Sequence, residues 1–431
     1  MPTAISSTNL LRVACVAAIV LFPLRALTCW VGDGLFYSLG VDYALYGASA
    51  EVAAQSGWPS IYNPDAITRS FAAWLSGGLD RGDPSTLAAH VYHAPFLFPF
   101  FATNLLGHLG GFVAWTILNL LLYAAIVREA GAGAGDVSTA TDRRDPIVEL
   151  APFAFLPFLF GLYLGQVVIV MAFGLYRALR AFTDGREWAA GCWLGVLLAK
   201  PQLGLIFVPV LLARRRWRAL GALMFVGAAL AAATIVLVGT EGIRGYLATA
   251  RAFSGFRQVP RLVYPWDMIS IRGILVQVLP ASVDEAQGLL AVHVLSAAML
   301  VVLVPIWRGP WNPREPWFAR RMLATMIVAL LAGFHTHVHA AVLLVPPLLM
   351  ALRRGQVSDP LRTLAALMFL VPTLSVAFNS NLVQGAWLLI ILMAGLLGSI
   401  LVDLARGERP CAAIARIAPR AAAISPGGVA R

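Results

Sequence analysis

The stretch Leu197-Leu198-Ala199-Lys200-Pro201-Gln202 joins two apolar runs, and its polar residues indicate how the chain folds. Lys200 is the one lysine of the chain, and the other 31 of its 32 Lys and Arg residues are arginine. An ammonium at bilayer depth costs several kcal/mol unless it faces a polar cavity or a partner. Pro201 ends a helix and disfavours helical geometry at the residue before it. The stretch therefore predicts a cation at a broken helix junction. There the lysine either snorkels to an interface or lines an anion site, and we favour the anion site.

The composition around this stretch is that of an all-α, polytopic integral membrane protein. Hydrophobic residues make up 59% of the chain and charged residues 12%, and the mean hydropathy is +0.78, whereas soluble domains carry about 25% charged residues. The net charge of +11 is spread over many loops, which indicates membrane topology and not nucleic-acid binding. The four cysteines lie far apart and form neither a zinc motif nor a disulfide framework: Cys15, Cys29, Cys192 and Cys411.

The apolar segments predict about twelve transmembrane helices. They fall near residues 11–31, 111–127, 150–164, 166–183, 188–199, 202–213, 219–239, 287–307, 322–334, 339–352, 362–378 and 383–404. The first is too long for a signal-peptide core and is expected to be retained. Several others are shorter than the ~20 residues that span a bilayer. Short helices of this kind are tolerated where the backbone lines a cavity.

Clusters of arginine in short loops orient these helices. Four loops fall on one side, which the positive-inside rule makes cytoplasmic: residues 214–218, 308–321, 353–354 and 406–409. The first outer loop, 32–110, contains interfacial helices, one of them the proline-rich segment 94–107. The second outer loop, 240–285, breaks the rule with five arginines, which we expect to serve an anion on the outer face.

The chain is therefore predicted to form one transmembrane domain over residues 1–405. Residues 131–135, Gly-Ala-Gly-Ala-Gly, follow a predicted helix and precede a charged loop, so they are expected to be a flexible cytoplasmic linker. They are not a dinucleotide-binding motif, which would need a strand before the glycines. The Ala-, Pro- and Arg-rich residues 406–431 are expected to be a disordered cytoplasmic tail.

With this topology, polar side chains from four separate outer segments gather at one end of the helices. They are Asp42 and Tyr46; Gly165 and Gln166; Lys200 and Gln202; and His335, Thr336, His337 and His339. Turns are polar in any case, but four such turns on one side suggest a shared cavity.

Two of these groups carry candidate chemistry. The histidines could bind zinc, but no carboxylate or cysteine lies nearby in the sequence to complete such a site. Hydrogen bonding to a phosphate or a sugar hydroxyl is therefore favoured, and no metal is expected. Asp42 is either a solvated loop aspartate or a general base, because a carboxylate at the edge of a low-dielectric cavity has its pKa raised toward a useful range.

Four motifs follow one another along residues 30–400. They are Asp42…Tyr46-x-Ala48…Gly57…Tyr62-Asn63, then Leu164-Gly165-Gln166, then Gly191 through Ala199-Lys200-Pro201-Gln202, and Met268-x-Ser270-x-Arg272-Gly273. In order and spacing they resemble the membrane glycosyltransferases of family 87, in the GT-C superfamily. Two stretches depart from the family's pattern. His93-Ala94-Pro95 stands where members often have Tyr-Pro-Pro, and His339-Ala340 where they often have a tyrosine–aspartate pair.

The resemblance implies a GT-C-type fold and an inverting sugar transfer from a polyprenyl-phosphate donor, without nucleotide, metal or other cofactor. Asp42 would be the general base on the acceptor hydroxyl. The donor phosphate and substrate would be bound by residues from the outer loops and turns: Tyr46, Tyr62, Gln166, Lys200, Gln202, Arg257, Arg261, Arg272, His335 and His339.

The resemblance further implies a place in the bacterial inner membrane, with the active site on the periplasmic face and membrane lipids as neighbours. By this resemblance the sugar would be mannose or arabinofuranose, and the acceptor a glycolipid, a polysaccharide end or a protein. A lipid transporter or flippase would also combine many crossings with intramembrane polar groups, and a non-catalytic membrane scaffold is a third alternative.

Overall fold

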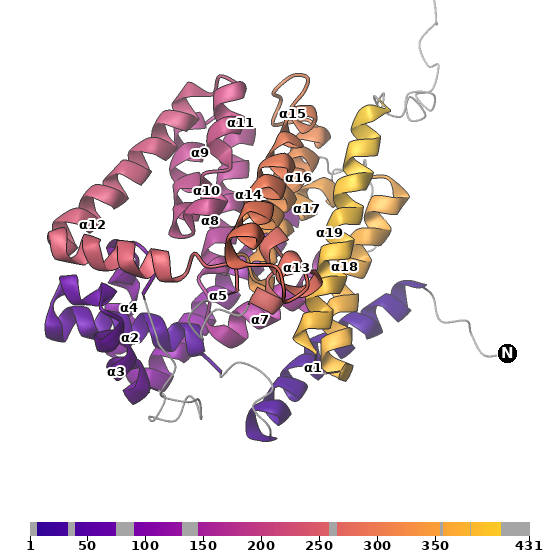
Figure 1. Ribbon diagram of the computed structural model, residues 1–431. Helices are drawn as coiled ribbons and strands as arrows, with labels where there is room; N and C mark the ends of the chain where they lie inside the picture. The colour runs from indigo at the N-terminus through magenta and orange to yellow at the C-terminus, as the bar shows by residue number, and fades with distance from the viewer. Residues whose placement is uncertain are drawn as a thin grey trace, which may run out of the picture.

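The computed structural model describes residues 7–32, 39–74, 90–131, 145–257, 265–353, 357–379 and 381–406. Within these residues the regular structure is helical, and a single isolated β-bridge joins Met268 to His337 (Figure 1). The prediction of an all-α chain is confirmed for this part of the protein. The prediction of a flexible linker mostly concerns residues outside it, and so does the prediction of a disordered tail.

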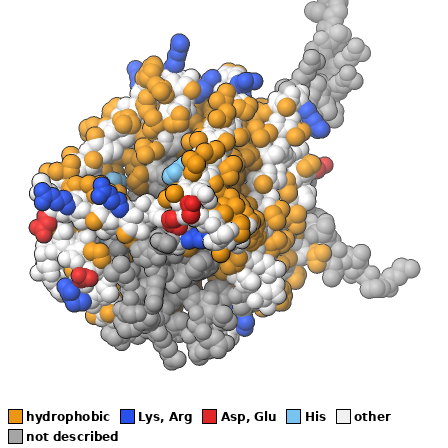
Figure 2. All heavy atoms as spheres, in the orientation of Figure 1, with side chains coloured by type: hydrophobic (Ala, Val, Ile, Leu, Met, Phe, Trp, Pro, Cys, Tyr) orange, Lys and Arg blue, Asp and Glu red, His pale blue; other side chains and the backbone are white. Residues whose placement is uncertain are grey.

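Six helical segments are long and apolar enough to cross a membrane. They are α1 (Ser7–Gly32), α5 (Gly107–Gly131), α12 (Trp217–Ala252), α14 (Glu285–Val301) continued by α15 (Leu303–Ile306), α18 (Asp359–Asn379) and α19 (Leu382–Ala405). Large apolar side chains on them remain exposed, such as Val236 and Leu290. Figure 2 shows hydrophobic side chains covering much of one face of the molecule. A surface of this kind fits lipid, and the chain is an integral membrane protein.

The other predicted crossings are built from short pieces. They are α6 (Pro146–Glu149), η4 (Ala151–Ala154), α7 (Leu156–Leu164), α8 (Val168–Thr183), α9 (Glu187–Leu194), η5 (Gly195–Ala199), α10 (Pro201–Gly204), α11 (Phe207–Ala213), α16 (Pro316–Ala332), η7 (Val338–Leu344) and α17 (Val345–Arg353). Each apolar segment found in the sequence is thus helical, and several of the helices are short, as expected. The count of twelve crossings stays a prediction.

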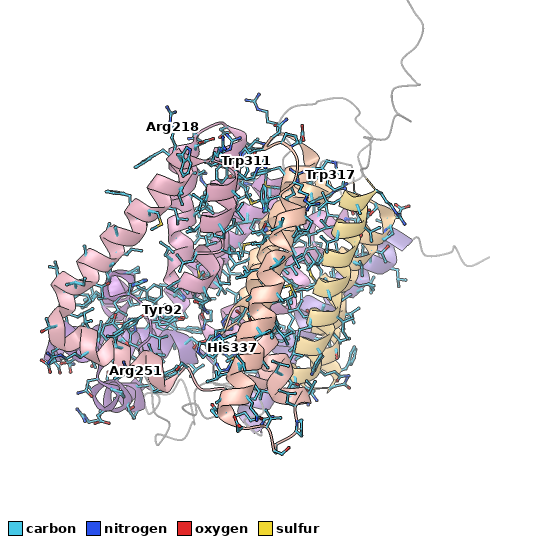
Figure 3. The ribbon with its side chains drawn as sticks, turned by 45° about the horizontal axis from the view of Figure 1, so that its top comes forward. Tyr92, Arg218, Arg251, Trp311, Trp317 and His337 are labelled. Carbon is cyan, nitrogen blue, oxygen red and sulfur yellow. The ribbon has the colours of Figure 1, made fainter. Side chains whose placement is uncertain are left out.

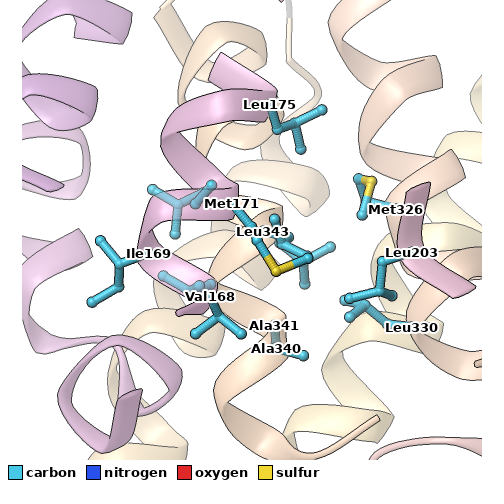
Figure 4. Packing of buried hydrophobic residues seen from close by; sticks show 14 of the residues in the cluster. Val168, Ile169, Met171, Leu175, Leu203, Met326, Leu330, Ala340, Ala341 and Leu343 are labelled. Atoms are coloured by element: carbon cyan, nitrogen blue, oxygen red, sulfur yellow. The ribbon is translucent and has the colours of Figure 1, made fainter. Parts of the chain in front are cut away.

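The core lies among the short helices. α8 packs against η7, and η7 packs against α16. Buried apolar side chains fill these contacts: Figure 4 shows Met171 of α8 beside Leu343 of η7, and Met326 of α16 beside Leu203 of α10. Helices that are apolar on all sides are buried within a protein. α8, α16, η7 and α17 therefore stand inside the bundle, and the long helices α5, α14 and α19 pack against them.

The remaining helices belong to the two loops that the sequence predicts to be outer. They are α2 (Val41–Ser56), η1 (Trp58–Tyr62), α3 (Pro64–Trp74), η3 (Ala94–Leu97), α4 (Phe98–Asn104), η6 (Pro265–Asp267) and α13 (Ile271–Val278). η3 and α4 cover the proline-rich segment and are far shorter than the ~20 residues that span a bilayer. That segment therefore does not cross as a straight helix, and its place at the membrane surface stays a prediction.

The second outer loop begins as helix. α12 continues to Ala252, beyond the expected end of the crossing near residue 239. It bends at Gly239, whose φ of 62° and ψ of −169° are accessible to glycine. The limb after this bend packs on η1 of the first outer loop, so the two loops meet.

The two ends of the bundle differ in character. Arg218 and Trp311 lie at one end, whereas Tyr92, Arg251 and His337 lie toward the other (Figure 3). This separation agrees with an arginine-rich cytoplasmic end and a polar site at the opposite end.

Candidate functional site

A cavity of about 370 Å³ lies where the two outer loops meet the turns between the short helices. Of the eleven residues predicted for the site, seven line it: Asp42, Tyr46, Gln166, Lys200, Gln202, His335 and His339. The cavity also contains His337, which the sequence places in the same turn. The expected convergence of four outer segments is thus present in the fold.

Local glycine geometry brings the first two segments together. Gly40, with a φ of 73°, directly precedes α2, and its amide donates to the carbonyl of Tyr163 near the end of α7. Gly165 ends α7 with a φ of 74°. A Cβ on Gly165 would lie 2.5 Å from the Cβ of Tyr43, so no larger residue fits there. The Leu-Gly-Gln turn therefore lies directly against the first turn of α2, which carries Asp42.

A chain of hydrogen bonds holds the carboxylate of Asp42. Gln166 Nε2 donates to Asp42 Oδ2 at 2.6 Å, and Gln166 Oε1 accepts from the hydroxyl of Tyr46 at 3.1 Å. The hydroxyls of Tyr46 and Tyr92 are 3.1 Å apart. This network fixes the amide orientation of Gln166, so that its NH₂ group faces the carboxylate.

The environment of Asp42 is suited to a base. Burial raises the pKa of Asp42 above its usual range. The hydrogen bond from Gln166 and the positive charge of Lys200 counteract this rise. Asp42 is half-buried and lines the cavity, so the carboxylate can reach a bound hydroxyl.

Lys200 stands at a helix break, as its sequence context predicts. η5 ends at Ala199, Lys200 is extended (φ −119°, ψ 91°), and Pro201 begins α10 at the position where a missing N–H costs nothing. Lys200 Nζ lies 3.1 Å from Nε2 of His339. The ammonium therefore faces a polar cavity within the protein.

The late histidine turn is attached to the second outer loop by backbone contacts. Met268 and His337 form an antiparallel bridge, and the amide of Ile269 donates to the carbonyl of Thr336 at 2.8 Å. The bridge brings Asp267 to the turn, where its Oδ1 lies 2.7 Å from His337 Nδ1. The sequence shows no carboxylate near these histidines, and the fold supplies one.

His335 is fixed by Arg272, which is fully buried. The guanidinium donates to His335 Nδ1 at 2.8 Å and to the carbonyls of Phe256 and Gly255. Burial and the adjacent guanidinium lower the pKa of His335 to about 3. His335 is therefore neutral, and its hydrogen is on Nε2 because Nδ1 accepts.

Three predicted residues lie behind the cavity wall or away from it. Arg272 reaches the cavity through His335, and the Tyr62 hydroxyl donates to the carbonyl of Tyr92 at 2.7 Å. The guanidinium of Arg257 donates to three backbone carbonyls of residues 279–283. Arg261 lies outside the described residues. The role of these arginines as donor ligands stays a prediction.

Several lining residues were not found from the sequence: Asp267, Tyr92, Tyr246, Phe71 and Phe253. The aromatic residues come from the two outer loops, and an aromatic side chain packs in a core as readily as it lines a cavity. Asp267 is isolated among arginines, as a solvated loop residue would be. Among the described residues, no cluster of three or more His, Cys, Asp or Glu side chains is arranged to hold a metal ion.

The family model for glycosyltransferase family 87 matches residues 90–333, more than half of the chain. The match includes Gln166, Lys200 and Arg272 but ends before the histidine turn and begins after Asp42. Comparisons with curated proteins and with solved structures gave no match.

Proposed function

Because the chain belongs to glycosyltransferase family 87 and is thus a membrane glycosyltransferase, we propose that it uses a polyprenyl-phosphate sugar as donor. The sugar passes to an acceptor hydroxyl on the outer face of the membrane with inversion, and Asp42 is the general base. The observation that carries this proposal is a half-buried carboxylate, held by Gln166, in the same cavity as Lys200.

Each group in the cavity has a role in such a transfer. Asp42 takes the proton of the acceptor hydroxyl as its oxygen attacks the anomeric carbon. Negative charge then develops on the phosphate that leaves, and a preorganised cation stabilises it. Lys200 is the lining residue that supplies this charge directly. The tyrosine hydroxyls of Tyr46 and Tyr92 offer further hydrogen bonds to sugar hydroxyls.

The position of α12 supports a lipid-linked donor. The limb after Gly239 contributes Tyr246, Thr249 and Phe253 to the cavity, whereas the limb before it carries exposed apolar side chains of a candidate membrane span. A donor can therefore place its sugar phosphate in the cavity while its polyprenyl tail stays in lipid.

The test uses purified protein in lipid nanodiscs. It is incubated with mannosyl and arabinofuranosyl polyprenyl phosphates, with and without glycolipid acceptors, and products are identified by mass spectrometry. We expect free polyprenyl phosphate and a glycosylated acceptor from one of the two donors. Both donors remaining intact would refute the proposed donor class, and movement of intact donor across the bilayer would indicate a flippase.

Asp42→Asn tests the base. The variant should lose about 10²–10⁴-fold in turnover, with unchanged melting behaviour. Asp65→Asn is the matched control, because it removes an exposed carboxylate of the same outer loop that does not line the cavity. Wild-type turnover in Asp42→Asn would remove Asp42 from the mechanism.

A further inference from the structure

The three histidines of the turn 335–339 differ in what they contact. Two of them face cations: His335 Nδ1 accepts from Arg272 at 2.8 Å, and His339 Nε2 lies 3.1 Å from Lys200 Nζ. A neighbouring cation disfavours a second positive charge. Lys200 is a pure donor, so His339 accepts from it. Both rings therefore act as neutral groups in the cavity.

His337 is the one of the three with a carboxylate partner. Its Nδ1 lies 2.7 Å from Oδ1 of Asp267, which is 3% exposed. A carboxylate oxygen accepts, so the ring donates through Nδ1. The other nitrogen, Nε2, is then left for the cavity, which His337 lines.

Backbone contacts fix this pair. The bridge between Met268 and His337 places Asp267, the residue before Met268, at the ring. The hydrogen bond from the amide of Ile269 to the carbonyl of Thr336 holds the same two segments one residue further along. The aspartate thus orients the ring as the outer partner of a histidine does in catalytic and metal sites.

The ring lies close to the other charged groups of the cavity. It stacks on the ring of His339 with centroids 5.7 Å apart and 15° between planes, and His339 contacts Lys200. The charges of His337 and Asp267 both act on the pKa of Asp42. Asp42, Lys200 and His337 therefore surround a single reaction space.

We propose that His337 is the general acid for the departing phosphate and that Asp267 is its positioning residue, an inference that rests on the proposed transfer. Asp42 accepts the proton of the acceptor hydroxyl, whose oxygen forms the bond to the anomeric carbon. The bond from that carbon to the phosphate oxygen breaks, and its electron pair stays on the oxygen. His337 delivers its Nε2 proton to that oxygen, so the product is a singly protonated polyprenyl phosphate. Afterwards Asp42 releases a proton to water and His337 takes one up, which restores the starting state.

The first test replaces the acid with a space that a small molecule can fill. In nanodiscs with the donor and acceptor of the wild-type reaction, His337→Gly should lose roughly 10²–10⁴-fold in kcat. Added imidazole should raise the kcat of this variant at least about tenfold, because it supplies the missing proton donor. A lost activity that imidazole does not restore would show a structural role and overturn the proposal, as would wild-type kcat in His337→Gly.

Two further variants keep the test independent of folding. His337→Gln retains the bulk of the side chain and should be inactive without rescue, whereas wild-type turnover in it would overturn the acid role. Asp267→Asn still accepts the Nδ1 hydrogen but lacks charge, and should lower kcat about tenfold or more with KM unchanged. A changed KM at unchanged kcat would place Asp267 in donor binding instead. If the wild type leaves the donor intact, the proposed function fails and this inference fails with it. If the wild type transfers sugar but the variants do not behave as expected, only the role of His337 as acid is refuted.

Discussion

Replacing Lys200 by methionine tests whether the cavity binds an anion. Methionine is unbranched and only one atom shorter than lysine, and it removes the charge and the three donors of the side chain. The ammonium lies 3.1 Å from His339 and lines the cavity. Because it faces a polar space between helices, its loss should affect a ligand more than the fold.

The expected size follows from the single interaction that is lost. A hydrogen bond to a charged group contributes about 1.5–3 kcal/mol, and each 1.4 kcal/mol corresponds to a factor of about ten in Kd. We therefore expect Lys200→Met to weaken binding of the polyprenyl-phosphate sugar roughly tenfold to hundredfold. Lys200→Arg should retain part of the affinity, because guanidinium is wider and planar and the residue is confined between His339 and Pro201.

Titration calorimetry of the donor into nanodisc-embedded protein measures this effect, with melting temperatures as the check on folding. Arg251→Met is the matched control. It removes a positive charge from the same end of the molecule, but at an exposed position that does not line the cavity (Figure 3). Wild-type affinity in Lys200→Met would mean that the lysine only snorkels, and the anion site would then have to be built around His335 and its neighbours.

Three further predictions concern the frame of the site. Since the hydrogen bond from Gln166 lowers the raised pKa of Asp42, Gln166→Leu should raise that pKa further. The base must be ionised, so the acidic limb of the pH–kcat profile should move to higher pH, and an unmoved limb would contradict the network. Gly165→Ala should lower the free energy of unfolding by about 1 kcal/mol or more, and with it the melting temperature. The reasons are the positive φ of Gly165 and the close approach of Tyr43. An unchanged melting curve would show that the turn can rearrange. A single cysteine at Leu109, in a cysteine-free background, should react with an impermeant reagent from outside. Labelling only from the cytoplasmic side would reverse the orientation from that helix onward.

Much of the scaffold was predictable because it depends on local rules. Apolar runs identified the helices, and Pro201 placed Lys200 outside helical geometry. The convergence of Gln166, Lys200 and the histidine turn was predictable for a related reason. Neighbouring crossings are antiparallel, so alternate turns fall at the same end of the bundle, and polar residues in them share that end.

The residues that were missed depend on contacts between distant segments. Asp267 joins the site through a pairing with His337 seventy positions later, which leaves no local mark. Arg257 was expected to bind an anion, but its donors are taken by backbone carbonyls near the start of α14. A guanidinium has five donors that satisfy carbonyls as well as phosphate, so its residue type does not distinguish these outcomes.

The short helices explain why the polar residues lie inside the protein. A straight helix of ~20 residues would carry its terminal turn to the membrane surface. Here the helix breaks at Gly165 and Lys200 and the non-helical residues 333–337 meet at a cavity, which Gln166, Lys200, His335 and His337 line. Unpaired backbone groups are tolerated at that depth where the space is enclosed by protein or water. The same interruptions that make these helices too short to span therefore create the polar space, and α12 is the long helix that contributes lining residues to it.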